Sequence, residues 1–363
     1  MWALNLLEFL VGLTIVVMTI VSVVRTLVVP RALQANLARI VFVLLRRVFR
    51  LRANERHPYR VRDSVMAFYA PVALLTLLFV WLALILFGYT LMFQAVGAES
   101  LRAAFAMSGS SLLTLGFATD PGMPELILTF TEAGIGLLFL ALVISYLPSL
   151  YASFQRRERG VSELEVRAGQ PPTGVYLLEL AWVVGRHETL RELWMQWEHW
   201  FTDVDESHSS YPALVHFRSP HADQSWVTAA GTVLDAASLF ASTVEGPRVP
   251  EAEFMIRSGY LCLRHIADFF QIPVDHDPKP DDPIQISREE FDVAYDRLAR
   301  TGVPVRADRD QAWRDFAGWR VNYDAALLGL ARLTMAPSAP WSSDRVAEAN
   351  YVPPLFRRPP AKP

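Results

Sequence analysis

Residues 99–124 lie between two long apolar stretches, and their composition is unusual for a connection. The segment is too polar to span a membrane and too apolar for an ordinary outer loop. Residues 99–113 have helical spacing and small side chains, and Glu99 at their start suits the positive end of a helix. The helix is expected to end at Thr114 and to continue as extended backbone to Asp120. Such backbone is tolerated at membrane depth only where it lines a cavity, and the negative end of the helix would favour a cation there.

The apolar stretch that follows this segment contains polar and helix-bending residues. Glu132 is a carboxylate within an otherwise apolar run, which marks a functional site by default because a buried acid is costly in a membrane. Pro148 lies about four turns later in the same run and is expected to kink the helix near the cytoplasmic mouth. A gate at this kink is one interpretation, and a proline without a gating role is the other.

Three almost charge-free stretches, residues 2–29, 64–93 and 126–151, must position these residues. Each exceeds the roughly 20 apolar residues that cross a bilayer, which excludes a single soluble domain. The first stretch lacks a basic start and a small-residue cleavage site, so it is interpreted as a spanning helix rather than a signal peptide.

Arginine placement predicts the orientation of these spans. Residues 25–62 contain ten arginines, and a second basic cluster, residues 155–159, follows the third span. The positive-inside rule places both clusters in the cytoplasm, and three spans are consistent with that. The expected location is a plasma membrane, with the N-terminus outside and the C-terminal domain in the cytoplasm.

Charge and cysteine content exclude other classes of protein. Residues 1–160 hold 14 arginines against 8 acidic residues, whereas the remainder holds 20 basic against 29 acidic residues. This split is typical of a membrane domain joined to a soluble domain, and neither part indicates nucleic-acid binding. The single cysteine, Cys262, excludes a disulfide framework and a thiolate metal site within one chain.

Residues 37–51 are expected to form an amphipathic helix between the first two spans. Apolar residues occupy one face and arginines crowd another. Such a helix suits the cytoplasmic headgroup layer, with its arginines near anionic lipid. An ordinary solvated linker helix is the alternative.

The segment Ser111-Leu-Leu-Thr-Leu-Gly-Phe-Ala118 resembles the pore loop of the potassium-channel family, specifically the two-span pore module of bacterial ion channels. That family places a pore helix and the sequence Thr-Val-Gly-Tyr-Gly-Asp between an outer and an inner helix. Here the resemblance covers about residues 64–155. It implies a selectivity filter formed by five residues: Thr114, Leu115, Gly116, Phe117 and Ala118.

The resemblance implies a role for each part of this filter. Main-chain carbonyls would replace the hydration shell of the ion, with Gly116 at positive φ and the Thr114 hydroxyl as the innermost ligand. Phe117 would pack behind the filter. Ala118 stands at the family's second glycine, and alanine at positive φ costs about 1 kcal/mol. The outer filter is therefore expected to differ from the family's, and a poorly selective or sodium-permeable pore stays open.

The resemblance also suggests roles for residues of the third span. Glu132 would support the filter by hydrogen bonding to the pore helix through Ser108 or Ser110, although a protonated Glu132 with no role in permeation is an alternative. Gly134 or Gly136 fits the family's hinge position. One pore loop per chain implies a homotetramer with cyclic symmetry, since four loops make a filter. The permeant species would be a monovalent cation, with K⁺ favoured, and no cofactor or metal is expected.

Residues 160–335 are predicted to form a mainly helical cytosolic domain with an unknown ligand or partner. Neither a nucleotide-binding Gly-rich motif nor a cyclic-nucleotide barrel is indicated. Ser287 and Glu290 match a capping box. Apolar spacing predicts five helices, namely 175–200, 224–243, 251–271, 287–301 and 308–334.

Five histidines fall within 35 residues of this domain. A metal or proton sensor is one interpretation, but no spacing matches a zinc site. The simpler interpretation is that these histidines and the nearby tryptophans belong to a helical bundle. Ser207-His208 has no nucleophile-elbow motif beside it, so no enzyme is expected. The histidines are His187, His199, His208, His216 and His221, and the tryptophans expected in the core are Trp182, Trp194, Trp197, Trp200 and Trp226.

The sequence therefore predicts an all-α membrane protein with three transmembrane helices, one re-entrant pore helix and filter loop, and a helical cytosolic domain. The favoured function is a tetrameric, potassium-conducting cation channel. A non-conducting membrane-anchored sensor or scaffold is the alternative. The expected parts are a first transmembrane helix (1–30), a basic amphipathic linker (31–62), a pore module (63–155, with its loop at 99–121), the cytosolic domain (160–335) and a Pro-rich tail (336–363).

Overall fold

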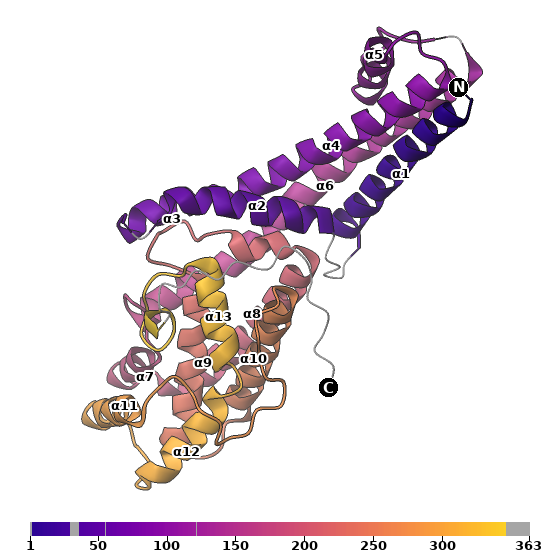
Figure 1. The fold of residues 1–363 in the computed structure, drawn as a ribbon. Helices are drawn as coiled ribbons and strands as arrows, with labels where there is room; N and C mark the ends of the chain where they lie inside the picture. The colour runs from indigo at the N-terminus through magenta and orange to yellow at the C-terminus, as the bar shows by residue number, and fades with distance from the viewer. Residues whose placement is uncertain (1, 30–35, 55, 121, 346–363) are drawn as a thin grey trace. The chain divides into compact units, whose positions relative to one another are not determined.

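The computed structural model describes residues 2–29, 36–54, 56–120 and 122–345. Within these residues the chain is helical, without a β-strand, as Figure 1 shows. Most of the predicted tail, residues 346–363, lies outside the described residues, as do residues 31–35 of the predicted linker. The α-helices are α1 (Trp2–Leu27), α2 (Asn36–Arg52), α3 (Tyr59–Ala67), α4 (Tyr69–Val96), α5 (Leu101–Leu112), α6 (Met123–Ala168), α7 (Gly174–Val183), α8 (Leu190–Ser210), α9 (Trp226–Thr243), α10 (Pro250–Phe269), α11 (Arg288–Arg300), α12 (Arg309–Arg320) and α13 (Asp324–Thr334).

The chain divides into two compact units. The first comprises Met1–Leu45 and Pro71–Tyr151, and the second comprises Arg46–Ala70 and Ala152–Pro363. The division places the end of α2 and all of α3 in the second unit, together with the last part of α6.

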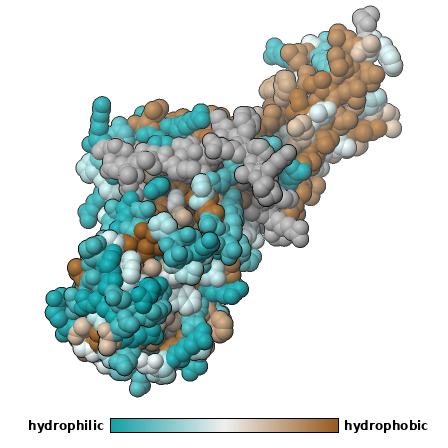
Figure 2. Space-filling view, turned by 60° about the horizontal axis from the view of Figure 1, so that its bottom comes forward, coloured by the Kyte–Doolittle hydropathy of each residue, from teal (hydrophilic) through white to brown (hydrophobic). Residues whose placement is uncertain are grey.

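Three helical segments are long and apolar enough to cross a membrane, which confirms that part of the predicted fold. They are α1, the run Tyr59–Val96 that contains α4, and α6. In the first unit α1, α4 and α6 pack together, and Trp81 of α4 donates a hydrogen bond to Ser22 of α1 (3.1 Å) and packs edge-on against Phe139 of α6. Apolar residues cover the outer surface of these helices in Figure 2.

The second unit is a bundle built around α9 (Figure 1). Nearly every residue of α9 is buried, and α7, α10, α12 and α13 pack against it. The predicted core tryptophans Trp194, Trp197, Trp200 and Trp226 are buried, and Trp182 packs against the core partly buried. The capping box at the start of α11 is confirmed, because the Ser287 and Glu290 side chains each pair with the other residue's backbone N–H.

Two of the five predictions of cytosolic helices are wrong, because the structure has two helices in each of those ranges. The predicted helix 175–200 breaks after α7, where Gly185 takes a φ of +66° and its N–H donates to Trp182, which ends the helix as a left-handed glycine commonly does. The predicted helix 308–334 breaks at Asn322, whose side chain donates to the Gly318 carbonyl at the end of α12 (2.9 Å). Helix α3 was not predicted.

Candidate functional site

Helix α5 begins at a polar cap and runs against both α4 and α6 in the first unit. The Ser100 hydroxyl accepts a hydrogen bond from the Ala103 N–H (3.2 Å), which satisfies one free donor of the first turn. The inner face of α5 is small and polar, with Ser108, Ser110 and Ser111 all buried. Small residues on this face allow its backbone to lie close to the longer helices.

Ser108 links α5 to both neighbouring helices. Its hydroxyl lies 3.1 Å from the Leu86 carbonyl of α4 and 2.6 Å from Oε1 of Glu132 in α6. Glu132 is fully buried, and the Ser108 contact is the hydrogen bond that the structure gives to its carboxyl group, since Oε2 has no partner among the described residues. Of the two serines expected to contact Glu132, the structure selects Ser108.

Gly136 allows the end of α5 to meet α6 directly. A Cβ atom at this position would lie 2.3 Å from the Leu112 carbonyl oxygen, so any larger residue would push the two helices apart. A Cβ atom at Gly134 would meet nothing within 4 Å. Helix α6 continues without interruption through both glycines and through Pro148, so the predicted hinge and gate at these residues remain predictions.

These contacts fix how far α5 descends beside α4 and α6. Leu112 meets α6 thirteen residues after its first residue, Met123, which corresponds to about 20 Å along the helix axis. Ser108 meets α4 ten residues before its last residue, Val96, which corresponds to about 15 Å. The two distances differ by about one helical turn. This is also the separation of Ser108 and Leu112 along α5, so the two contacts are consistent with each other.

The loop after α5 is folded back onto Ser110. The Ser110 carbonyl accepts hydrogen bonds from the N–H groups of Leu115 (2.8 Å) and Gly116 (3.4 Å). The Ser110 hydroxyl accepts one from the N–H of Ala118 (3.1 Å). One buried serine therefore holds three of the five predicted filter residues by their backbones, a role that the sequence did not reveal.

The loop contains two left-handed residues. Gly116 has a φ of +72°, as expected for the predicted filter glycine. The second is Thr114, with a φ of +55°, whereas Ala118 does not adopt the left-handed conformation expected at that position. The Thr114 hydroxyl donates to the Leu113 carbonyl (2.7 Å).

Several apolar side chains of α5 and its loop are exposed within the single chain. Phe117 is 70% exposed, so within this chain it does not pack behind the loop as expected. Leu115, Leu113 and Phe105 are also more than half exposed. The side of α5 away from α4 and α6 is thus free to contact lipid or another chain.

The histidine cluster of the second unit does not form a metal centre among the described residues. His199 and His221 are exposed, and His187 stacks on Trp182. His208 and His216 are buried in separate places. Burial holds the pKa of both well below the ordinary histidine value, and nearby Arg157 and Arg46, respectively, lower them further.

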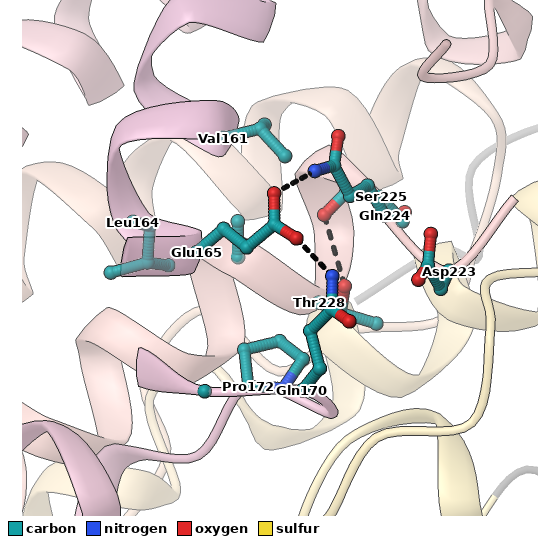
Figure 3. Close-up of a pocket in the computed structure, with 11 residues that line it drawn as sticks. Val161, Leu164, Glu165, Gln170, Pro172, Asp223, Gln224, Ser225 and Thr228 are labelled. Atoms are coloured by element: carbon teal, nitrogen blue, oxygen red, sulfur yellow. Dashed lines mark hydrogen bonds between the residues drawn. The ribbon is translucent and has the colours of Figure 1, made fainter. Parts of the chain in front are cut away.

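The described residues of the second unit form a groove of ligand size. A groove of about 1080 Å³ is lined by residues of α7–α10 and α12, including Trp182, Phe240, Trp319, Arg248 and Arg306. A second pocket, shown in Figure 3, holds only about 20 Å³. Its Glu165 side chain accepts hydrogen bonds from Gln170 and Gln224, so this carboxylate already has partners within the chain.

No protein-family model, curated protein or solved structure matches this chain.

Proposed function

We propose that this protein is one subunit of a homotetrameric cation channel, with K⁺ as the favoured ion. The observation that carries the proposal is the packing of α5 alongside α4 and α6. Helix α5 ends in a loop with polar backbone, about 20 Å along α6 from its first residue, Met123. The hydrocarbon core of a bilayer is about 30 Å thick, so this loop would lie near its middle if α4 and α6 span it.

The chemistry of that position favours a cation. The C-terminal end of a helix carries partial negative charge, and free carbonyl oxygens of the loop can take the place of water around an ion. Gly116 at positive φ supports this use of the backbone, because it turns the chain in a way that residues with a Cβ atom oppose. Backbone at this depth also requires a water-filled or protein-lined cavity.

A tetramer would complete such a cavity. Each chain offers one loop, and an ion surrounded by carbonyls needs several loops around an axis. The exposed side chains of Phe105, Leu115 and Phe117 give α5 and the loop after it an apolar surface for neighbouring chains. Cyclic symmetry places the same surface at every interface.

Selectivity is the part of the proposal in which this chain departs furthest from the potassium-channel pattern. The Ala118 N–H is occupied by Ser110, and Ala118 does not take the left-handed conformation. The inner ring, formed by Thr114 to Gly116, is therefore proposed as the main ion site. A wider, less selective outer ring is the corresponding variant of the proposal.

The second unit is proposed to regulate the pore from the cytoplasm. Its groove of about 1080 Å³ is large enough for a small organic ligand and combines aromatic with charged side chains. Chain continuity through α6 joins this unit to the proposed inner helix.

The test is single-channel recording of the purified protein in planar bilayers, with K⁺ on one side and Na⁺ on the other. We expect cation currents from the wild-type protein, with a reversal potential that favours K⁺. Gly116→Ala should abolish them, because the new Cβ meets no atom within 4 Å and acts only by opposing a φ of +72°, at about 1–2 kcal/mol in each subunit.

Gly109→Ala is the matched control, since it adds the same methyl group to α5 with only an ordinary 3.8 Å contact and no positive φ. It should conduct like the wild-type protein. Normal currents from Gly116→Ala would exclude the carbonyl filter. Absence of current from correctly inserted wild-type protein under every stimulus would instead favour a membrane-anchored sensor or scaffold.

A further inference from the structure

Within the second unit, the end of α2 and all of α3 use one face to bond the rest of the unit. The Arg46 guanidinium is buried and donates to the Leu333 carbonyl at the end of α13. The Tyr59 hydroxyl of α3 donates to the Met335 carbonyl (3.1 Å). Arg218 ties these pieces together, because it donates to the Tyr59 hydroxyl (2.6 Å) and to the carbonyl of Met335 (2.9 Å) and forms an ion pair with Asp63.

The opposite face of α2 is apolar and exposed. Successive residues of a helix turn by about 100°, so Val48 and Leu51 lie roughly opposite the buried Arg46. Val48 is 58% exposed and Leu51 is 77% exposed. Arg47 and Arg52 lie on either side of this apolar stripe, and both are exposed.

Helix α3 repeats the pattern. Tyr59, Asp63 and Met66 face the rest of the second unit. Val61 lies on the opposite side of α3 and is 46% exposed. Arg60 is exposed beside it. Together, Val48, Leu51 and Val61 with Arg47, Arg52 and Arg60 form an outward face that we call the basic apolar face.

The chemistry of this face selects its partner. An apolar stripe bordered by guanidinium groups matches the boundary between acyl chains and headgroups, where the stripe enters the lipid and the cations meet phosphate. None of these three guanidinium groups has a carboxylate partner among the described residues. They are therefore free to pair with an external anion.

The position of α2 and α3 along the chain favours a location of the basic apolar face at a bilayer surface. Helix α2 lies between the first two membrane-spanning candidates, and α3 is the start of the second, Tyr59–Val96. Helix α4 starts at Tyr69, directly after Phe68 at the end of α3. The charged residues Arg60, Arg62 and Asp63 make α3 too polar for the hydrocarbon core itself. A position in the headgroup layer satisfies both constraints.

We propose that the basic apolar face binds the surface of an anionic phospholipid bilayer. Because the other face of the same helices is bonded to the end of α13 and to Arg218, this contact would anchor the second unit to the membrane. The proposal does not depend on ion conduction, so it can fail or succeed separately from the channel proposal.

The test is spin-label accessibility in the full-length protein reconstituted into vesicles. Nitroxides are attached at Leu51→Cys or Val61→Cys, and at Val293→Cys as the control, an exposed valine of α11 in the same unit. The native Cys262 is buried and is not expected to react. Vesicles contain either phosphatidylcholine alone or a mixture with phosphatidylglycerol.

We expect labels at residues 51 and 61 to collide with oxygen more, and with a water-soluble nickel complex several-fold less, than the label at residue 293. The difference should be larger in vesicles that contain phosphatidylglycerol. Replacing Arg47, Arg52 and Arg60 with Gln should remove that lipid dependence. Nickel collisions equal to those at residue 293 in both vesicles would overturn the proposal. Labels shielded from both reagents would also overturn it, because a protein surface would then cover the face.

Discussion

Acid should destabilise the second unit through two buried histidines. His208 lies in α8, where its Nδ1 is 2.8 Å from the Val204 carbonyl and its Nε2 is 3.3 Å from a guanidinium nitrogen of Arg157. Nδ1 therefore carries the proton and Nε2 accepts from Arg157. A second proton on Nε2 would place two cations in contact in a buried site. Among the described residues, Glu158 is the carboxylate that bonds Arg157.

His216 is in a similar position beside other groups. It is buried between the rings of Tyr69 and Phe270, and Arg46 lies close enough to disfavour a positive charge on it. Burial is the main cause of the lowered pKa of both histidines. At mildly acidic pH the unfolded chain therefore binds protons at these histidines that the folded chain does not bind.

The sign and size of the effect follow from this difference. A lowered pKa in the folded state contributes stability above about pH 6.5, and this contribution is lost as the pH falls. At pH 5.5, one unit below the ordinary histidine pKa, each histidine would cost between about 1 and 2 kcal/mol, so the two together would cost about 3 kcal/mol. For a unit of about 240 residues, this lowers the melting temperature by about 6–12 °C.

The assay is thermal unfolding followed by tryptophan fluorescence at pH 7.5 and 5.5, since eight of the ten tryptophans lie in the second unit. His208→Gln keeps an acceptor for Arg157 without a titrating group and should reduce the shift by about half. His199→Gln, at an exposed site on the same helix, should leave it unchanged. An undiminished shift in His208→Gln would refute the reasoning, as would a melting temperature that does not change with pH.

Two further predictions concern buried ionisable residues. Glu132→Gln keeps the hydrogen bond with Ser108 and should retain both the cation currents and the tetramer. Glu132→Leu loses that bond and should lose the currents, the tetramer or both. If the two variants behave alike in recordings and in size-exclusion chromatography, Glu132 does not support the filter. Arg320→Met leaves Asp235 buried without its ion pair and should cost about 3–5 kcal/mol of unfolding free energy in urea. The half-exposed pair of Arg309 and Asp296 gives the control, since Arg309→Met should cost less than about 1 kcal/mol of unfolding free energy. Similar losses from both variants would contradict the idea that burial makes the loss of Arg320 costly.

The sequence alone determined the elements that depend on local pattern. Three apolar stretches were long enough to predict α1, α4 and α6, because the thickness of a bilayer sets the length of a span. The capping box at Ser287 and the amphipathic pattern of α2 were also readable, since their signals lie within a few turns. Helix α5 was predicted for the same reason.

The tertiary structure decided everything that depends on residues far apart in the chain. Ser108 and Glu132 are 24 positions apart, and only the packing of α5 against α6 determines that Ser108, rather than Ser110, makes the contact. Ser110 is thereby left to hold the loop. The Asp235–Arg320 pair, 85 positions apart, and the outward face of α3 likewise had no local signal, because a side chain is inside or outside only with respect to what packs beside it.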